Sequence, residues 1–188
     1  KNNLYGEMST TGEITLETQY QDLKEANDGI YIAKQNDKYG IIDNMGNIQI
    51  SYEYQGITYN EKAQLFFAED AQYNTSIIDN QYNVKATGIL SDVNTDEEYI
   101  RMRDNDEYKY YNLTGEEISN IQALKNNTIF LSKKDGKYGY VDKKGNSVTE
   151  FIYDDATEQN KYGYAAVKKD GLWGSIDKEG KEIIEPKY

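Results

Sequence analysis

The sequence predicts an all-β protein built from tandem meander repeats. An aromatic residue recurs at spacings of 34, 34, 35, 30 and 35 residues. Its six positions are Tyr5, Tyr39, Tyr73, Tyr108, Tyr138 and Trp173. The 188 residues include 19 tyrosines, and tyrosine is favoured in β-strands. The chain has no amphipathic stretch rich in alanine and leucine, so no long helix is expected. We therefore interpret residues 1–188 as one repeat domain whose units begin near the six aromatic residues.

Each unit begins with a predicted hairpin. In the second unit, residues 39–43 and 47–52 have the pattern of two strands, joined by a turn from Asp43 to Gly46. The aspartate side chain can accept local N–H groups, and glycine adopts a positive φ at little cost. Glycine stands seven residues after the aromatic residue in five units, at Gly12, Gly46, Gly115, Gly145 and Gly180. In the third unit Tyr82 occupies the place where this glycine is expected.

A third strand is predicted later in each unit, for example at residues 29–34, 65–69 and 164–168. A Lys-Asp-Gly turn such as 169–171 then returns the chain to the next aromatic residue. The aromatic residue and the apolar residue three positions later point to opposite faces of a strand, so both faces should be covered. Each unit is thus a meander of three strands, or four, over about 34 residues.

One such unit cannot bury its apolar face alone, so neighbouring units must cover it. A β-propeller-like ring is the favoured arrangement, because blades of three or four strands are familiar in propellers. The alternative is an open β-repeat array or solenoid, in which the units stack along a curved line.

Several segments resemble the WG (KWG) repeats of bacterial proteins. They are residues 136–146 (GKYGYVDKKGN), residues 171–181 (GLWGSIDKEGK) and residues 183–188 (IIEPKY). Residues 153–156 and 164–167 are similar to the segment that links two such repeats. Only Trp173 retains the tryptophan, and tyrosine replaces it elsewhere. The resemblance implies an all-β repeat fold, often on exported or surface-associated bacterial proteins. It implies no activity and no catalytic residues.

The composition excludes several functional classes. Without cysteine or histidine the chain has no disulfide, no thiolate nucleophile, no Ser-His-Asp triad and no imidazole metal site. The 33 acidic residues against 21 basic ones give a net charge of −12, which disfavours nucleic acid as a partner. No apolar run approaches the roughly 20 residues that span a membrane, so no membrane insertion is expected.

Acidic residues occur in pairs, but the pattern does not predict a catalytic dyad. Neighbours such as Glu97 and Glu98 point to opposite faces of a strand, so they cannot act together on one substrate. The densest acidic run, residues 104–107, lacks the glycine and the distal glutamate of a calcium loop. We expect no catalytic residues, no metal site and no cofactor.

The favoured function is a non-enzymatic binding or scaffold module on the outside or the surface of a bacterium, with a cytoplasmic location as the alternative. Its partner would be a protein or a cell-surface glycan, met by a tyrosine-rich acidic surface. The candidate binding residues are the tyrosines that vary between units: Tyr59, Tyr99, Tyr110 and Tyr162. Two alternatives remain: a glycan hydrolase that uses carboxylates from different units, and a structural spacer in a larger surface protein. The oligomeric state is left open.

Overall fold

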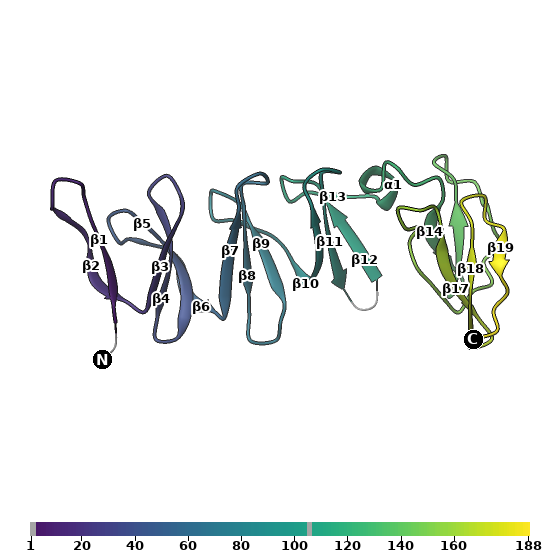
Figure 1. The fold of residues 1–188 in the computed structure, drawn as a ribbon, viewed down its shortest axis with the longest axis horizontal. Helices are drawn as coiled ribbons and strands as arrows, with labels where there is room; N and C mark the ends of the chain where they lie inside the picture. Colours follow the sequence, from purple (N-terminus) through teal and green to yellow (C-terminus); the bar gives the residue numbers. More distant parts are fainter. Residues whose placement is uncertain (1–2, 105–106) are drawn as a thin grey trace. The chain divides into compact units, whose positions relative to one another are not determined.

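The computed structural model describes residues 3–104 and 107–188, and nearly all of its regular structure is antiparallel β-sheet (Figure 1). The chain falls into two compact units, residues 1–117 and residues 118–188. The all-β prediction is confirmed. The assignment of residues 1–188 to one repeat domain stays a prediction.

Unit 1 holds three sheets, and each runs in sequence order. The first sheet comprises β1 (Tyr5–Met8) and β2 (Ile14–Tyr20). The second comprises β3 (Asp22–Asn27), β4 (Ile30–Gln35), β5 (Lys38–Asp43) and β6 (Ile48–Tyr54). The third comprises β7 (Gly56–Asn60), β8 (Leu65–Glu69), β9 (Thr75–Ile78), β10 (Val84–Asn94), β11 (Tyr99–Asp104), β12 (Glu107–Tyr111) and β13 (Glu117–Ile118).

The third sheet consists of two meanders that share one long strand. The first half of β10, from Val84 to Gly88, pairs with β9. The second half, from Ile89 to Asn94, pairs with β11. Strand β10 therefore closes one four-stranded meander and opens the next.

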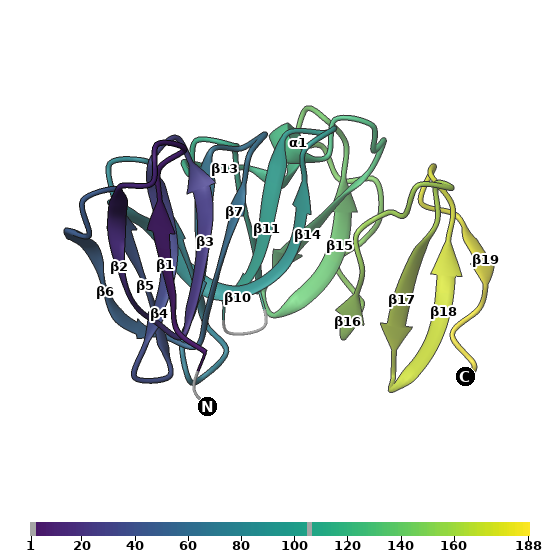
Figure 2. The same ribbon diagram turned by 60° about the vertical axis from the view of Figure 1, so that its left-hand side comes forward.

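Unit 2 contains two sheets and a short helix. The helix is α1 (Asn120–Ala123), and the first sheet comprises β14 (Phe130–Lys134) and β15 (Lys137–Val141). The second sheet comprises β16 (Asp155–Ala156), β17 (Ala165–Lys169), β18 (Leu172–Ile176) and β19 (Glu182–Ile184). Figure 2 shows β17, β18 and β19 side by side, and β19 forms the edge of its sheet.

The predicted strands agree with the structure to within two residues, and the complete meanders hold four strands. The predicted strand 65–69 coincides with β8, and 29–34 overlaps β4. The additional strand is β3, which is the first strand of the second sheet. Strand β7 is likewise the first strand of the third sheet, and β16 is the first strand of the last sheet. The sequence of β3, DLKEAN, is mostly exposed and polar, so no hydrophobic pattern reveals it. Its backbone pairing with β4 makes it a strand.

The turn chemistry of the prediction is confirmed. The five glycines placed seven residues after the aromatic residue have φ between 80° and 86°. Tyr82, in the glycine's place, also has a positive φ of 64°. The turn before β18 has positive φ at both Asp170 and Gly171, as the tightest two-residue hairpins require.

The third repeat departs from the predicted alignment. Tyr73 lies in the turn between β8 and β9 with a φ of 65°, so it does not begin a strand. Its N–H donates to the carbonyl oxygen of Asp70 at 3.2 Å. Thr75 takes the strand position that Tyr39 holds in the second sheet, because it pairs with Glu69 across the hairpin. A longer turn in this repeat has moved the strand two residues along the chain.

The core of unit 1 lies between successive sheets, and alternate side chains of one strand serve two interfaces. In β4, Tyr31 packs with Leu16 of the first sheet, whereas Ile32 packs with Phe66 of the third. Leu65 and Phe67 of β8 pack with Ile100, on the opposite side from Phe66. Both faces of the middle sheets are therefore covered, as the opposite parity of the apolar positions predicts.

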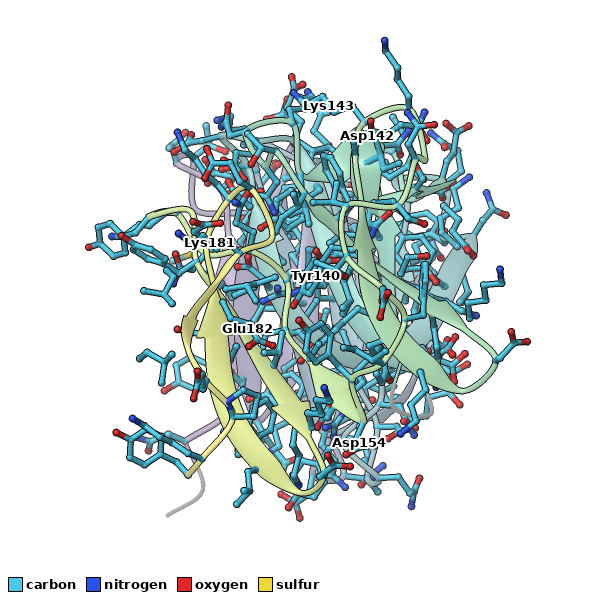
Figure 3. The ribbon with its side chains drawn as sticks, turned by 90° about the vertical axis from the view of Figure 1, so that its right-hand side faces the viewer. Tyr140, Asp142, Lys143, Asp154, Lys181 and Glu182 are labelled. Atoms are coloured by element: carbon cyan, nitrogen blue, oxygen red, sulfur yellow. The ribbon has the colours of Figure 1, made fainter. Side chains whose placement is uncertain are left out.

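Unit 2 has a core of its own, centred on Tyr140 (Figure 3). Tyr140 is fully buried, and its hydroxyl donates to the carbonyl oxygen of Thr157 at 2.7 Å. It packs with Val167 and Ile176, which come from the following sheet. Burial raises the pKa of the Tyr140 hydroxyl, so this residue remains a neutral donor.

Candidate functional site

The four candidate tyrosines occupy different environments, and two of them are buried. Tyr99 and Tyr110 lie in β11 and β12, with their ring centroids 5.8 Å apart in an edge-to-face arrangement. The Tyr99 hydroxyl donates to Asp92 at 3.2 Å, and burial raises its pKa. The rings of Tyr99 and Tyr110 are thus packing residues, and their burial removes them as a stacking surface for a ligand.

Tyr162 and Tyr59 are the accessible members of the set. Tyr162 is 72% exposed in the loop before β17, and the ammonium of Lys161 lies 5.0 Å from its ring centroid. Tyr59 is half-buried at the end of β7, with its ring 4.7 Å from that of Phe66. Phe66 is itself buried in the core, so one side of the Tyr59 ring is held in place. Of the four tyrosines, Tyr59 lines a pocket of the structure.

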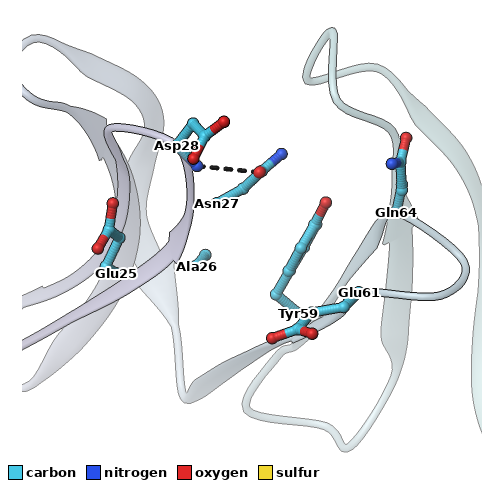
Figure 4. Close-up of a pocket in the computed structure, with 7 residues that line it drawn as sticks. All are labelled: Glu25, Ala26, Asn27, Asp28, Tyr59, Glu61 and Gln64. Carbon is cyan, nitrogen blue, oxygen red and sulfur yellow. Dashed lines mark hydrogen bonds between the residues drawn. The ribbon is translucent and has the colours of Figure 1, made fainter.

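That pocket, which we call the acidic hollow, lies within unit 1 between the β3–β4 hairpin and the β7–β8 hairpin. Its volume is about 420 Å³. Its lining residues are Glu25, Ala26, Asn27, Asp28, Tyr59, Glu61 and Gln64 (Figure 4). Ala26 and Tyr59 pack against the hydrophobic cluster between the second and third sheets, so the base of the hollow is tied to the core. Its position follows from the packing of these two sheets.

Local hydrogen bonds hold the two hairpin ends that border the hollow. Glu25 accepts a hydrogen bond from the N–H of Gly29 at 3.2 Å, and Gly29 turns the chain with a φ of 69°. The Asn27 side chain accepts from the N–H of Asp28 at 2.9 Å. On the other hairpin, Asn60 accepts from the N–H of Ala63 at 2.9 Å through its side chain. Both rims are thus ordered by their own turns.

The electrostatics of the hollow are one-sided. Glu25, Asp28 and Glu61 supply three carboxylates, and its lining contains no lysine or arginine. Throughout residues 3–104 and 107–188, no group of three acidic side chains is arranged to hold a metal ion. The hollow is therefore suited to a cationic group larger than a metal ion, with an aromatic ring at its base.

Sequence reasoning missed most of the acidic hollow. It singled out Tyr59, but Glu25, Asp28 and Glu61 are three of 33 acidic residues and stand out by no local pattern. The hollow arises because the ends of two hairpins in successive sheets face each other. The Asp28-Gly29 pair marks one of these hairpin ends in the sequence, but nothing in the sequence shows that the two ends adjoin.

The acidic pairs lie on strands and turns. Glu98 has a positive φ of 62° in the turn between β10 and β11. In the acidic run 104–107, Asp104 pairs with Lys109 at 3.0 Å, whereas residues 105 and 106 lie outside the described part of the chain. Among the described residues, no helix has the length and apolar character needed to cross a membrane.

The recurrent aromatic residue is a partly buried repeat element in three units. Tyr39, Tyr138 and Trp173 are half-buried, and each faces a lysine directly across its hairpin. The distances from lysine Nζ to the ring centroid are 5.4, 4.9 and 5.6 Å, for Lys34, Lys133 and Lys168 respectively. Tyr5 differs because its ring is exposed in the first sheet. These cation–π pairs are part of the fold and leave the acidic hollow as the candidate site.

Comparisons with solved structures find β proteins at low identity. They include the WD40 β-propeller domain of Doa1 (12% identity, 88% of this chain and 67% of that chain, TM-score 0.35). They also include BamB from Moraxella catarrhalis (12% identity, 84% and 60%, TM-score 0.35) and virginiamycin B lyase from Staphylococcus aureus (14% identity, 100% and 78%, TM-score 0.38). The chain spans 60% of the BamB chain and 67% of the Doa1 domain. At these TM-scores the similarities say nothing about ligands or partners of this chain.

Comparison with known families identifies the repeats themselves. No curated protein sequence matches the chain. The WG containing repeat matches residues 5–39, 138–173 and 173–188, which include the first hairpin and the sheet β16–β19 of unit 2. Each of these segments contains an aromatic-glycine pair that is followed by a glycine-closed turn. These three segments of the chain therefore match the WG containing repeat.

Proposed function

We propose that the chain is a non-enzymatic binding module that recognises a basic segment of a protein partner at the acidic hollow. The observation that carries the proposal is the lining of the hollow, where three carboxylates surround a half-buried tyrosine with no cation among them. A lysine or arginine side chain suits this lining. Its aliphatic stem can pack on Ala26 and Tyr59, and its charged end can reach the carboxylates.

The weakness of single exposed ion pairs favours a protein over a small amine. Each exposed pair is worth about 0–1 kcal/mol, so one cation in the hollow binds weakly. A partner that presents several basic side chains can add contacts along the acidic surface of the repeats. The net charge of −12 attracts such a partner before contact and raises its association rate.

The carboxyl groups support a non-enzymatic role over the hydrolase alternative. A glycosidase needs one carboxylic acid with a raised pKa to protonate the leaving group. The aspartates with a resolved shift are Asp43, Asp70, Asp79, Asp142 and Asp154, and the pKa of each is lowered. Hydrogen bonds to the ionised form are the shared cause, and they disfavour a proton donor at these positions. The proposal retains a location outside or on the surface of a bacterial cell.

The proposal is tested by neutralising the hollow and measuring the binding of a basic peptide. The probe is a labelled peptide of alternating arginine and glycine, titrated at low and at physiological salt. In the hollow variant, Glu25→Gln, Asp28→Asn and Glu61→Gln remove three charges. In the control variant, Glu17→Gln, Glu53→Gln and Glu150→Gln remove three charges from exposed positions elsewhere.

We expect the hollow variant to bind at least tenfold more weakly than the wild type, and the control variant to lose much less. An equal loss in both variants would show that the peptide responds to net charge alone, and would refute the hollow as the site. A glycan array serves as the second arm. A glycan that binds the wild type but not a Tyr59→Ala variant would replace the basic protein segment as the ligand.

A further inference from the structure

Three equivalent turns follow one another in unit 1, and a lysine of the chain itself bridges the second and the third. Asn27, Asn60 and Asn94 end β3, β7 and β10. The side chain of each accepts a hydrogen bond from an N–H group of the turn that follows. The ammonium of Lys62 in the second turn lies 3.0 Å from a carboxylate oxygen of Asp96 in the third. A cation thus joins these two neighbouring turns.

The acidic hollow lies at the corresponding place between the first and the second turn. Asp28 belongs to the first turn, whereas Glu61 and Gln64 belong to the second. Within the described part of the chain, the side chains of these three residues have no hydrogen bond and no ion pair. The hollow therefore presents carboxylate and amide oxygens from two hairpins, and none of these oxygens has a donor within the described residues.

Tyr59 gives the hollow a flat aromatic wall. Its ring lies 4.7 Å from the ring of buried Phe66, with the two planes tilted by 45°. Figure 4 shows the Tyr59 side chain between the two hairpins. Because the hydrophobic cluster holds this ring on one side, a planar cation can stack on the side that faces the hollow.

The number and placement of the acceptors decide between the two basic side chains. A guanidinium has five N–H donors spread around one plane, so it can reach carboxylates on both hairpins while it stacks on Tyr59. An ammonium has three donors on one nitrogen and acts as a point charge. The contact of Lys62 shows this, because its ammonium meets the single carboxylate of Asp96.

We propose that the acidic hollow selects arginine over lysine in the basic segment that it binds. This inference rests on the proposed function, and it names the side chain that the site recognises. Glu61 is the residue that determines the specificity, because it supplies the carboxylate on the second hairpin. Without Glu61 the remaining carboxylates of the hollow, Glu25 and Asp28, lie on one hairpin, and a guanidinium can no longer bridge the two.

The test compares two labelled peptides of equal length and charge, one of alternating arginine and glycine and one of alternating lysine and glycine. Both are titrated at physiological salt against the wild type, the hollow variant and the control variant. Glu61→Gln is added as a single change, and Glu53→Gln is its matched control. All substituted positions are exposed, so every variant should keep the wild-type far-UV circular dichroism.

We expect the wild type to bind the arginine peptide about fivefold more tightly than the lysine peptide, the size of one added net hydrogen bond. The preference should disappear in the hollow variant and in Glu61→Gln, and should persist in the control variant and in Glu53→Gln.

The outcomes separate this inference from the proposed function. If the wild type binds both peptides equally and the hollow variant weakens both, arginine selection is refuted and the hollow remains the binding site. A preference for arginine that survives in the hollow variant would also overturn the inference, because the selectivity would then lie elsewhere on the chain. Equal losses of affinity in the hollow and control variants would refute the proposed function and this inference together.

Discussion

At the scale of single residues, an aspartate closes several hairpin turns of the fold. The Asp142 carboxylate accepts hydrogen bonds from the N–H groups of Lys144 and Asn146 at 2.8 and 2.9 Å. The Asn146 side chain donates to its second oxygen at 2.9 Å and is the first cause of the lowered pKa of Asp142. Asn112 holds the equivalent turn in another repeat, where its side-chain oxygen accepts from the N–H groups of Thr114 and Glu116. The first residue of the turn thus needs a side-chain oxygen that accepts hydrogen bonds, whereas a negative charge on that side chain is not required.

The lowered pKa makes the turn sensitive to acid. The folded-state pKa of Asp142 lies below its ordinary value of 3.8. Its contribution to stability is therefore complete above that value and is lost as the pH falls through the folded-state pKa. We expect Asp142→Asn to be somewhat less stable than the wild type at pH 7, because its amide nitrogen replaces the oxygen that accepts from Asn146. It should lose less stability than the wild type between pH 4 and pH 2, a range of about two units below the ordinary value.

The comparison is made by urea unfolding at a series of pH values. Asp142→Ala is the matched variant, because it removes the acceptor as well as the charge and should be less stable than Asp142→Asn at pH 7. Equal stability of the asparagine and alanine variants at pH 7 would contradict the role of the side-chain acceptor.

The sequence predicts these turns well but misjudges some single residues. An aspartate or asparagine three residues before a glycine is a local signal, so Asp43, Asn112 and Asp142 could be recognised without a structure. Tyr82 could not be placed in the left-handed region in advance, because its positive φ is imposed by the turn, where its N–H donates to Asp79. The burial of Tyr99 was also missed, because its contacts with Asp92 and Tyr110 come from the pairing of β10, β11 and β12 and leave no local signal at Tyr99.

At the scale of elements, the glycine after the aromatic residue allows two strands to approach closely. A Cβ placed on this glycine would lie 2.4 to 2.9 Å from a backbone carbonyl oxygen in all four units, at Gly6, Gly40, Gly139 and Gly174. In the second sheet the cause is a register shift, because Tyr39 pairs with Tyr54 whereas Ile41 pairs with Ile50. The extra residues of β6 bring its backbone against Gly40.

Replacing Gly40 with alanine should therefore destabilise the sheet. The new Cβ would lie 2.6 Å from the carbonyl oxygen of Ile50, and Gly40 is buried, so the strands must separate. We expect Gly40→Ala to lower the free energy of unfolding by about 1–3 kcal/mol, the usual cost of overpacking. Urea unfolding measures the change.

Gly56→Ala is the matched control for Gly40→Ala. A Cβ at Gly56 meets nothing within 4 Å, and the backbone there is outside the left-handed region. Alanine should leave stability unchanged or raise it by up to about 1 kcal/mol, because it restricts the unfolded chain. A similar loss in both variants would refute the close-approach explanation.

The prediction of elements succeeded where hydrophobic side chains alternate and failed where backbone pairing alone forms the strand. Strand β8 has four buried residues among five, and its bounds were predicted correctly. Strand β3 pairs with β4 through residues that are mostly exposed, and its sequence resembles a polar loop. The acidic hollow depends on β3, because Glu25 and Asn27 lie in that strand. The site was thus hidden for the same reason as the strand.

At the scale of the whole molecule, stability reflects a balance between repulsion and local attraction. The net charge is −12, and like charges distributed over one chain destabilise its compact state. Ion pairs such as Lys62–Asp96, at 3.0 Å, and the lysines that lie over aromatic rings act in the opposite direction. Exposed ion pairs are worth about 0–1 kcal/mol each, so the excess negative charge should dominate the response to salt.

Sodium chloride should therefore raise the melting temperature at pH 7, because salt screens the repulsion between carboxylates. We expect a rise equivalent to about 1 kcal/mol, which is about 2–4 °C for a chain of this size. Calorimetry at increasing salt measures it, and a falling melting temperature would show that the attractive pairs dominate. Magnesium and calcium chloride at matched ionic strength form the control. They should act alike, since the described residues contain no carboxylate cage, whereas an added rise with calcium alone would reveal a calcium site.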